Sequence, residues 1–323
     1  MSRARRLRDV GEHGWLARVL PGLPAGPRVL IGPGDDAAVL RAGRGPQLVT
    51  VDALIEGVHF RRAWATPRVL GRRAFRVGAS DLAAMGARPT AVLLALECAP
   101  THPEAEITSL VRGLAAEAGR HGAALVGGNL SAGTRLGASV TVLGEAPGRI
   151  LTRAGARAGH LVVVTGTLGA SAAAVRALRR GRRVPWPLPP DRLAAGVLLA
   201  RHATAMIDLS DGLLQDLGHV CRASGVGARV DVERLPVAPR CVALAGTAAR
   251  GLALAGGGDY ELLATVSAAR WPALRAAATR VRCRLTVIGE IVAGRGVAVH
   301  ERGVAVRGDA RGGWDHFARP PRP

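Results

Sequence analysis

Six aspartates stand in four short acidic motifs, punctuated by glycine and serine, in a chain whose formal net charge is +20. The motifs are residues 34–39, 50–52, 80–86 and 207–212, and their aspartates are Asp35, Asp36, Asp52, Asp81, Asp208 and Asp211. Carboxylates that are brought together repel one another, so a cation has to hold them. Hard divalent cations take oxygen ligands, and Mg²⁺ commonly binds carboxylates beside phosphate groups. The pattern therefore indicates metal-dependent phosphate chemistry.

The basic residues narrow this chemistry, because all 44 of them are arginine and none is lysine. A P-loop requires the lysine of its Gly-Lys-Ser/Thr segment, and a Schiff-base enzyme requires a lysine amine. Both classes are therefore excluded. Any phosphate binding has to rely on metal ions, arginine side chains and backbone amides.

The positive charge does not indicate a nucleic-acid-binding protein. The arginines are scattered along the chain, and aromatic residues, which stack on bases, make up only 3% of it. A GC-rich genome accounts for the absence of lysine and for the single asparagine and tyrosine. No apolar run approaches the ~18 residues of a membrane span, and the four cysteines lack paired spacing. We expect a cytoplasmic protein with free thiols and without nucleic-acid or membrane partners.

The 323 residues, of which 48% are hydrophobic, are enough for two domains. In the first half, apolar patterns predict strands alternating with helices. The expected strands are 47–51, 91–97, 123–126 and 138–143, and the expected helices are 66–85 and 103–121. The turn-rich segment Gly144–Arg149 then marks a boundary, giving domains of residues 1–148 and 149–323.

The second half opens with a buried strand, Leu161–Thr165, and a glycine-containing loop, Gly166–Ser171, that begins an Ala-rich helix. Such a loop could bind phosphate at a helix N-terminus. A tight strand-to-helix turn requires glycines in any case, so a packing role stays open. Residues 179–190 contain four Arg and four Pro and are expected to form an exposed loop.

With the motifs placed on these elements, the chain resembles the thiamine-monophosphate kinase family, in the ATP-binding superfamily that includes aminoimidazole ribonucleotide synthetase. Seven segments match in family order: 34–38, 51–60, 79–89, 151–156, 207–217, 257–262 and 314–317. The resemblance implies a mixed α/β, two-domain fold of the aminoimidazole ribonucleotide synthetase type. It also implies an N-terminal ATP- and metal-binding domain that forms a barrel-like sheet shared across a homodimer. The C-terminal α/β domain is then expected to close the active-site cleft.

The resemblance implies an enzyme that transfers the γ-phosphoryl group of ATP to the phosphate of thiamine monophosphate, giving thiamine diphosphate and ADP. The acceptor is already an anionic oxygen, so the main obstacle is repulsion between an anion and a polyanion. Two unit charges about 4 Å apart repel by ~4 kcal/mol at an effective dielectric of 20. Several Mg²⁺ ions would offset that repulsion, so we expect direct in-line transfer by positioning and charge neutralisation. Participation of a monovalent cation stays open.

The matching motifs also imply roles for individual residues. The implied metal ligands are Asp36, Thr50, Val51 through its carbonyl oxygen, Asp52, Asp81, Asn129, Asp208 and Asp211. The implied ATP contacts are Gly128, Asn129, Arg153 and Ser210. The implied contacts to thiamine monophosphate are His59, Gly258 and Trp314, with Trp314 placed to stack on the thiamine ring. Transfer itself is expected to depend on Asp81, Asp211 and Arg153.

Several of these residues have a structural alternative. Asp208 and Asp211 precede a helix and could cap it. His59 could be a packed histidine, and Trp314 could anchor the C-terminal segment. The two acidic residues of the motif 257–262 are expected to hold local structure rather than to act in catalysis.

Two positions depart from the family pattern. Asn129 stands where the family has the aspartate of a Gly-Gly-Asp motif; its amide oxygen can bind a metal but carries no charge. Gly258 stands where the family often has a glutamate that contacts the substrate, so that contact is lost or supplied elsewhere.

Sister enzymes fit the sequence less well. A selenophosphate synthetase would carry a reactive cysteine or selenocysteine near its N-terminus, whereas the first cysteine here is Cys98. A hydrogenase-maturation relative would end in cysteine, whereas this chain ends in Pro323. The open alternatives are another ATP-dependent synthetase of the superfamily and a catalytically silent protein that binds Mg-ATP.

Overall fold

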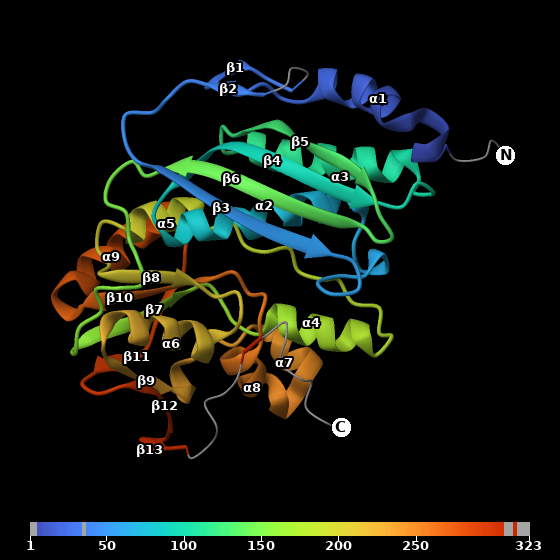
Figure 1. Ribbon diagram of the computed structural model, residues 1–323. Coiled ribbons are helices and arrows are strands. Elements are labelled where there is room, and N and C mark those ends of the chain that lie inside the picture. The colour runs from blue at the N-terminus through green and yellow to red at the C-terminus, as the bar shows by residue number, and fades with distance from the viewer. Residues whose placement is uncertain (1–4, 34–36, 307–312, 315–323) are drawn as a thin grey trace. The chain divides into compact units, whose positions relative to one another are not determined.

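The structure, a computed structural model, describes residues 5–33, 37–306 and 313–314. Contacts divide the chain into two units (Figure 1). The first consists of Met1–Leu82 with Ala87–Pro147, and the second of Ala83–Gly86 with Gly148–Pro323. Both units combine helices with β-sheet, so the expected mixed α/β fold is confirmed.

Within the described residues, the first unit contains α1 (Leu7–Val19), η1 (Leu20–Gly22), β1 (Val29–Ile31), β2 (Val39–Leu40), β3 (Gln47–Ile55), η2 (Arg62–Trp64), α2 (Pro67–Ala84), β4 (Arg88–Cys98), α3 (Glu104–Gly119), β5 (Ala124–Ala132) and β6 (Gly137–Glu145). Strands β1 and β2 pair with each other, and the other four form a sheet in the order β3-β6-β4-β5. In that sheet β6 is antiparallel to both of its neighbours, whereas β4 and β5 are parallel.

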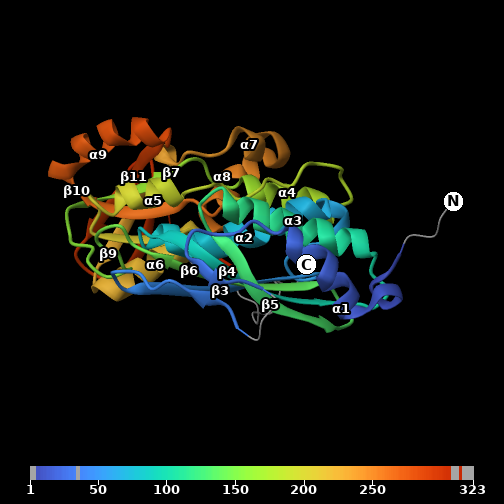
Figure 2. The ribbon, with the colours of Figure 1, turned by 90° about the horizontal axis from the view of Figure 1, so that it is seen from above.

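The two faces of this four-stranded sheet differ because successive residues of a strand point to opposite sides. On one face, apolar side chains such as Leu48 and Val142 are buried, and α2 and α3 cover that face (Figure 2). On the opposite face, Val49 is 63% exposed and Val51 is 67% exposed. The alternation places Thr50 on the covered face, since it lies between these two valines.

Helices α2 and α3 approach each other closely at two glycines. A Cβ atom at Gly71 would lie 1.9 Å from the carbonyl oxygen of Leu110, and one at Gly113 would lie 2.2 Å from that of Arg68. Any other residue would therefore push the helices apart. Since α2 carries Asp81 in its last turn, this contact helps to fix where that carboxylate lies.

The second unit contains β7 (His160–Thr165), α4 (Ala170–Arg179), α5 (Leu193–Leu199), β8 (Ala205–Asp208), α6 (Leu213–Ser224), β9 (Gly227–Asp231), η3 (Val232–Arg234), α7 (Pro239–Ala245), η4 (Gly246–Ala248), α8 (Ala249–Ala255), β10 (Leu262–Ser267), η5 (Ala268–Arg270), α9 (Trp271–Ala278), η6 (Thr279–Val281), β11 (Leu285–Val292), β12 (Gly296–Glu301) and β13 (Val304–Ala305). Its sheet has the order β13-β12-β9-β11-β7-β10-β8.

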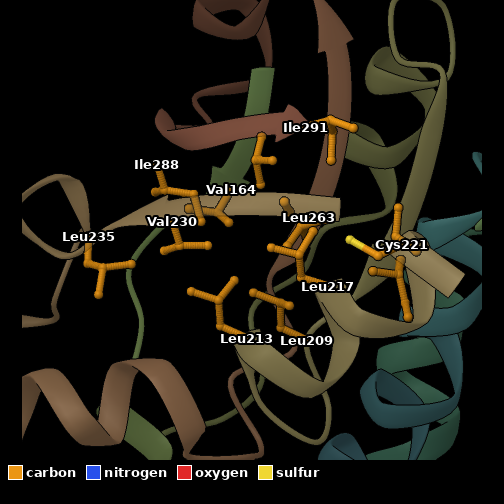
Figure 3. Close-up of a cluster of buried hydrophobic side chains, with 14 of the residues drawn as sticks. Val164, Leu209, Leu213, Leu217, Cys221, Val230, Leu235, Leu263, Ile288 and Ile291 are labelled. Atoms are coloured by element: carbon orange, nitrogen blue, oxygen red, sulfur yellow. The ribbon is translucent and has the colours of Figure 1, made fainter. Parts of the chain in front are cut away.

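The core of the second unit lies between this sheet and α6 (Figure 3). Leu213 and Leu217, four residues apart, lie on one side of α6, as the helical repeat requires. They pack among Val230, Leu263 and Ile288 of the sheet, all of which are buried. This packing fixes the first turn of α6, which follows directly on the acidic motif 207–212.

Most elements expected from the apolar patterns are present, with ends that differ by a few residues. The helices expected over 66–85 and 103–121 are α2 and α3. The main difference is β5, which the sequence predicts to end at Val126 but which continues to Ala132. Two glycines within this extension disfavour a strand locally, and pairing with β4 over its whole length outweighs that preference.

The Arg- and Pro-rich segment between α4 and α5 forms a loop, as predicted, and its arginines are exposed. In the described part of the chain, no helix combines the length and the apolar character that crossing a membrane requires.

Candidate functional site

In the first unit, Thr50 and Asp52 of β3 lie on the helix-covered face of the sheet, and Asp81 lies in the last turn of α2. The Thr50 hydroxyl donates a hydrogen bond to Asp81 Oδ2 at 2.5 Å. Asp52 Oδ1 accepts the backbone N–H of Ala53 at 2.7 Å. The fold thus brings Thr50 and Asp81 into contact, although they are 31 residues apart.

Asn129 and Gly128 lie on β5, at the other edge of the same sheet. Three strand spacings of about 4.8 Å separate the two edges, or roughly 14 Å. A Cβ atom at Gly128 would lie 1.9 Å from the carbonyl oxygen of Leu94, so the pairing requires glycine there. The structure does not bring Asn129 together with Thr50 and Asp81.

His59 lies in the tight turn that follows β3. The ring Nδ1 of His59 accepts the backbone N–H of Ile55 at 3.0 Å. The backbone N–H of His59 donates to the Ile55 carbonyl at 2.9 Å. Because Nδ1 is an acceptor, the neutral ring carries its proton on Nε2. Beside this turn is a cavity of about 440 Å³ whose lining includes Glu56, Arg62 and Arg135.

In the second unit, the acidic motif forms the turn between β8 and α6. Asp208 ends β8 and is buried. The N–H groups of Asp211 and Gly212 both donate to Asp216 Oδ2, at 3.2 Å and 3.0 Å. Asp216 therefore caps this turn, a role that the sequence left open for Asp208 and Asp211.

Asp216 lies in the matched segment 207–217, but no role was predicted for it from the sequence. Burial is the largest cause that raises the pKa of its carboxyl, to about 7, and the charge of Asp211 acts in the same direction. The signal was present in the sequence, since Asp216 follows Gly212 by four residues and acidic residues favour the first turn of a helix.

Arg153 lies in the segment before β7, and Ser224 at the end of α6 holds that segment. The Ser224 hydroxyl donates to the Arg153 carbonyl at 3.2 Å and accepts the N–H of Ala156 at 3.1 Å. Burial lowers the pKa of His219 on α6, and the charges of Arg222 and Arg153 lower it further. The Arg153 guanidinium is thus near α6.

Trp314 and Gly258 both contact the turn between β8 and α6. The Trp314 N–H donates to the Asp211 carbonyl at 3.0 Å, and the Gly258 N–H donates to the Ser210 carbonyl at 2.7 Å. The Trp314 side chain is 41% exposed. Four sequence-predicted site residues are therefore together here, whereas the rest of that motif, Asp315–Phe317, is outside the described residues.

The loop between β7 and α4 binds the protein's own carboxylates. The N–H groups of Gly169 and Ser171 donate to Asp259 at 2.6 Å and 3.4 Å. Glu261 forms a two-point ion pair with Arg192, at 2.5 Å and 2.8 Å. These contacts favour the packing role for the loop over phosphate binding, because its amides already donate to a carboxyl group of the protein.

The donor atoms suit a hard cation, since hydroxyl and carboxylate oxygens are the ligands that Mg²⁺ prefers. The four cysteines are free and buried, so soft thiolate ligands are not offered. Among the described residues, no three or more His, Cys, Asp or Glu side chains are grouped as a metal centre would need. Asp35 and Asp36 lie outside the described residues.

Comparison with known proteins matches both halves of the chain. Residues 34–146 match the family described as AIR synthase related protein, N-terminal domain, and residues 157–302 match its C-terminal domain. The thiamine-monophosphate kinase of Mycobacterium tuberculosis is 40% identical over 275 residues, which cover 80% of this chain and 81% of that protein.

Two solved structures are similar over most of the chain. One is the thiamine-monophosphate kinase from Stenotrophomonas maltophilia, with a TM-score of 0.79, 37% identity, and coverage of 90% of this chain and 95% of that one. The other is AaThiL complexed with AMPPCP and TMP, with a TM-score of 0.74, 29% identity, and coverage of 98% and 100%.

Proposed function

The chain belongs to the thiamine-monophosphate kinase family, within the AIR synthase related proteins, and we propose that it catalyses that family's reaction. The γ-phosphoryl group of ATP is transferred to the phosphate of thiamine monophosphate, giving thiamine diphosphate and ADP. The observation that carries this proposal is the similarity of 98% of the chain to a structure solved with AMPPCP and TMP.

Mg²⁺ is the cation we propose for the acidic motifs. Thr50, Asp52 and Asp81 would hold it in the first unit, and Asp208 and Asp211 in the second. The all-oxygen donor set and the direct Thr50–Asp81 contact support this assignment. When bound, Mg²⁺ supplies positive charge that offsets the repulsion between the two phosphate-bearing substrates.

The protein's own groups would then bind and orient the substrates. The Arg153 guanidinium offers hydrogen-bond donors of the geometry that phosphate accepts. His59 Nε2 carries a proton that can be donated to an anionic oxygen, and the Trp314 indole can stack on a thiamine ring. Gly128, Asn129, Ser210 and Gly258 complete the contacts that the family resemblance implies.

No general base is required in this reaction, because the attacking oxygen of the acceptor phosphate is already ionised. Catalysis would consist of holding two anions in line and excluding water. Free thiamine should therefore be a poor acceptor, since its hydroxyl would have to lose a proton first.

We also propose that the first unit forms a homodimer through the uncovered face of its four-stranded sheet. Val49, Val51 and Leu93 expose apolar side chains there, at 63%, 67% and 36%. Large apolar side chains exposed on one face of a sheet are typical of protein interfaces. A second copy packed on this face would bring the two sheets together into the shared barrel that the family resemblance implies.

The function is tested with purified protein, ATP, Mg²⁺ and thiamine monophosphate, by measuring ADP and thiamine diphosphate together. We expect equal amounts of both products, and little product with free thiamine. Formation of ADP without thiamine diphosphate would favour a sister ATP-dependent enzyme. Nucleotide binding without either product would favour the catalytically silent alternative, which the changes at Asn129 and Gly258 leave open.

A further inference from the structure

Gln215, in the first turn of α6, contacts two of the residues expected to act in the reaction. Its Nε2 donates one hydrogen bond to Asp211 Oδ2 at 3.1 Å and another to the Trp314 carbonyl at 3.1 Å. The Trp314 N–H in turn donates to the Asp211 carbonyl at 3.0 Å. The three hydrogen bonds form a closed ring through Asp211, Gln215 and Trp314.

A glutamine amide suits this position because its nitrogen carries two hydrogens and can serve both acceptors at once. The bond to Asp211 fixes the rotation of that carboxylate and uses Oδ2. Within the described residues no hydrogen bond uses the other oxygen, Oδ1. The carboxylate is thus held by one oxygen, and the second is left for a cation.

The chain at Gly313 is seated directly on this glutamine. A Cβ atom at Gly313 would lie 2.0 Å from Gln215 Oε1 and 2.7 Å from Gln215 Cβ. Any larger residue at 313 would therefore displace the Gln215 side chain or move away from it. The closeness indicates that the segment carrying Trp314 rests on Gln215.

Gln215 is not needed to build the helix on which it lies. Asp216 caps the N–H groups of Asp211 and Gly212, so the start of α6 is stabilised without the glutamine amide. Glutamine and methionine also have similar helix propensities. The main effect of the contacts of Gln215 is therefore on the positions of Asp211 and Trp314, and not on the stability of α6.

We propose that Gln215 is a positioning residue that couples the Asp211 carboxylate to Trp314, so that cation binding and thiamine-ring binding are set together. This inference rests on the proposed function for its kinetic consequences. If Gln215 loses its donor, the Asp211 carboxylate rotates more freely and the segment carrying Trp314 is held by one hydrogen bond fewer. The affinity for Mg²⁺ and the affinity for thiamine monophosphate should both weaken in the same variant.

The test is Gln215→Met, which keeps the length of the side chain and removes both donors. We expect the Mg²⁺ concentration at half-maximal activity to rise about tenfold, as for a lost hydrogen bond to a charged group. The KM for thiamine monophosphate should rise about threefold to tenfold, as for a lost hydrogen bond to a neutral carbonyl. The KM for ATP at saturating Mg²⁺ and the Tm should stay close to their original values. Gln47→Met, at the chain's other glutamine, is the matched control and should change none of these quantities.

A second measurement does not depend on activity. Hydrogen–deuterium exchange of the peptide containing Gly313 and Trp314 should be faster in Gln215→Met than in the unaltered protein, without any substrate. Gly313→Ala should have the same effect on exchange and on the KM for thiamine monophosphate. If the unaltered protein forms no thiamine diphosphate, the proposed function fails, and exchange still tests the contact.

Two results would overturn the inference. One is a Gln215→Met protein with a lower Tm but unchanged KM and Mg²⁺ dependence, which would make Gln215 a purely structural residue. The other is unchanged exchange at Trp314, which would mean that Gln215 does not hold that segment.

Discussion

Thr50 and Asp81 are the predicted metal ligands that contact each other directly, through the hydrogen bond of 2.5 Å. A hydroxyl that donates to a carboxylate lowers the repulsion that the carboxylate would exert on its acidic neighbours. This hydrogen bond therefore orients the Asp81 carboxylate before a cation arrives. The charge of Asp81 can be tested separately from the shape of its side chain.

Asp81→Asn should cut turnover by at least ~10²-fold, the scale on which charged transition-state stabilisers act, and should change the Tm little because the two side chains have nearly the same shape. Steady-state rates at saturating and at limiting Mg²⁺ measure this effect. Asp231→Asn is the control, because the Asp231 carboxylate forms ion pairs with Arg229 and Arg234 and has no predicted part in the reaction. Near-native turnover of Asp81→Asn at limiting Mg²⁺ would show that this carboxylate is structural.

Asn129 gives a second test at a single position. Asn129→Asp places a charge where the amide oxygen stands, and the two side chains occupy nearly the same space. If Asn129 is a metal ligand, the variant should reach half-maximal activity at a lower concentration of free Mg²⁺, measured by titration at fixed ATP. A half-saturation point that stays constant or rises would assign Asn129 to the nucleotide or to the β5 backbone.

The site residues could be predicted from the sequence only as far as the motifs extend. The motifs indicated Thr50, Asp81, Asp211 and Trp314. In the structure Thr50 contacts Asp81, and Trp314 contacts Asp211. Gln215 was missed because a glutamine on a helix has no chemistry that singles it out. Its spacing of four residues from Asp211 places both on one side of a helical turn, which is the signal that could have found it.

At the scale of elements, α4 shows how a buried acid stabilises a helix start. Asp259 accepts the N–H groups of Gly169 and Ser171, and burial raises the pKa of its carboxyl to about 7. The pKa in the unfolded chain is near the ordinary value of 3.8. As pH rises between these two values, the folded protein keeps a proton that the unfolded chain has lost. Asp259 therefore contributes stability that is complete below pH 3.8 and is lost as pH rises through about 7.

We expect the free energy of unfolding to fall more steeply between pH 4 and pH 8 in the unaltered protein than in Asp259→Asn, by a few kcal/mol over that range. Urea denaturation at several pH values measures both slopes. The slopes are compared, and not the absolute values, because the asparagine amide in Asp259→Asn also weakens one of the two hydrogen bonds from Gly169 and Ser171 at every pH. Equal slopes would mean that Asp259 is ionised throughout and that burial does not control its proton.

The crossing of α2 and α3 gives a prediction about packing. Gly71→Ala would place a Cβ atom 1.9 Å from the Leu110 carbonyl oxygen, so the helices must separate. We expect a loss of stability of ~1–3 kcal/mol, as for other overpacked cores, together with lower activity because α2 carries Asp81. Gly14→Ala in α1 is the matched control, since nothing lies within 4 Å of its added Cβ. Thermal unfolding that ranks the two variants equally would contradict the close crossing.

The elements themselves were predictable where an apolar pattern decides them, as in α2 and α3. The extension of β5 past Val126 was not, because glycine is a poor strand former and only pairing with β4 keeps Gly127 and Gly128 extended. The same holds for the cap at Asp259, which is 90 residues from Gly169 in the sequence. Contacts between distant segments carry no local pattern from which they could be read.

At the scale of the whole molecule, the chain is two units whose sheets differ in how they are covered. The second unit buries its core between its sheet and α6, whereas the sheet of the first unit leaves apolar side chains of β3 and β4 exposed. A monomer with such a face would lose solubility, and association with a second copy would cover it. We therefore expect the proposed homodimer to depend on this face, and a substitution on the face can test it.

Val49→Glu places a charge on the exposed face, where Val49 is 63% exposed, without disturbing the buried side of β3. If two copies associate through this face, the buried and unpaired carboxylate should convert the dimer into a monomer, with Leu93→Glu acting in the same way. Light scattering coupled to gel filtration measures the mass. Val304→Glu in the second unit, at a valine that is 70% exposed, is the matched control and should leave the mass unchanged.

Activity is measured on the same samples, because a dimer-dependent site would lose turnover with the dimer. An unaltered protein that is a monomer at assay concentration, and fully active, would refute the shared sheet and leave the exposed face without a role in catalysis.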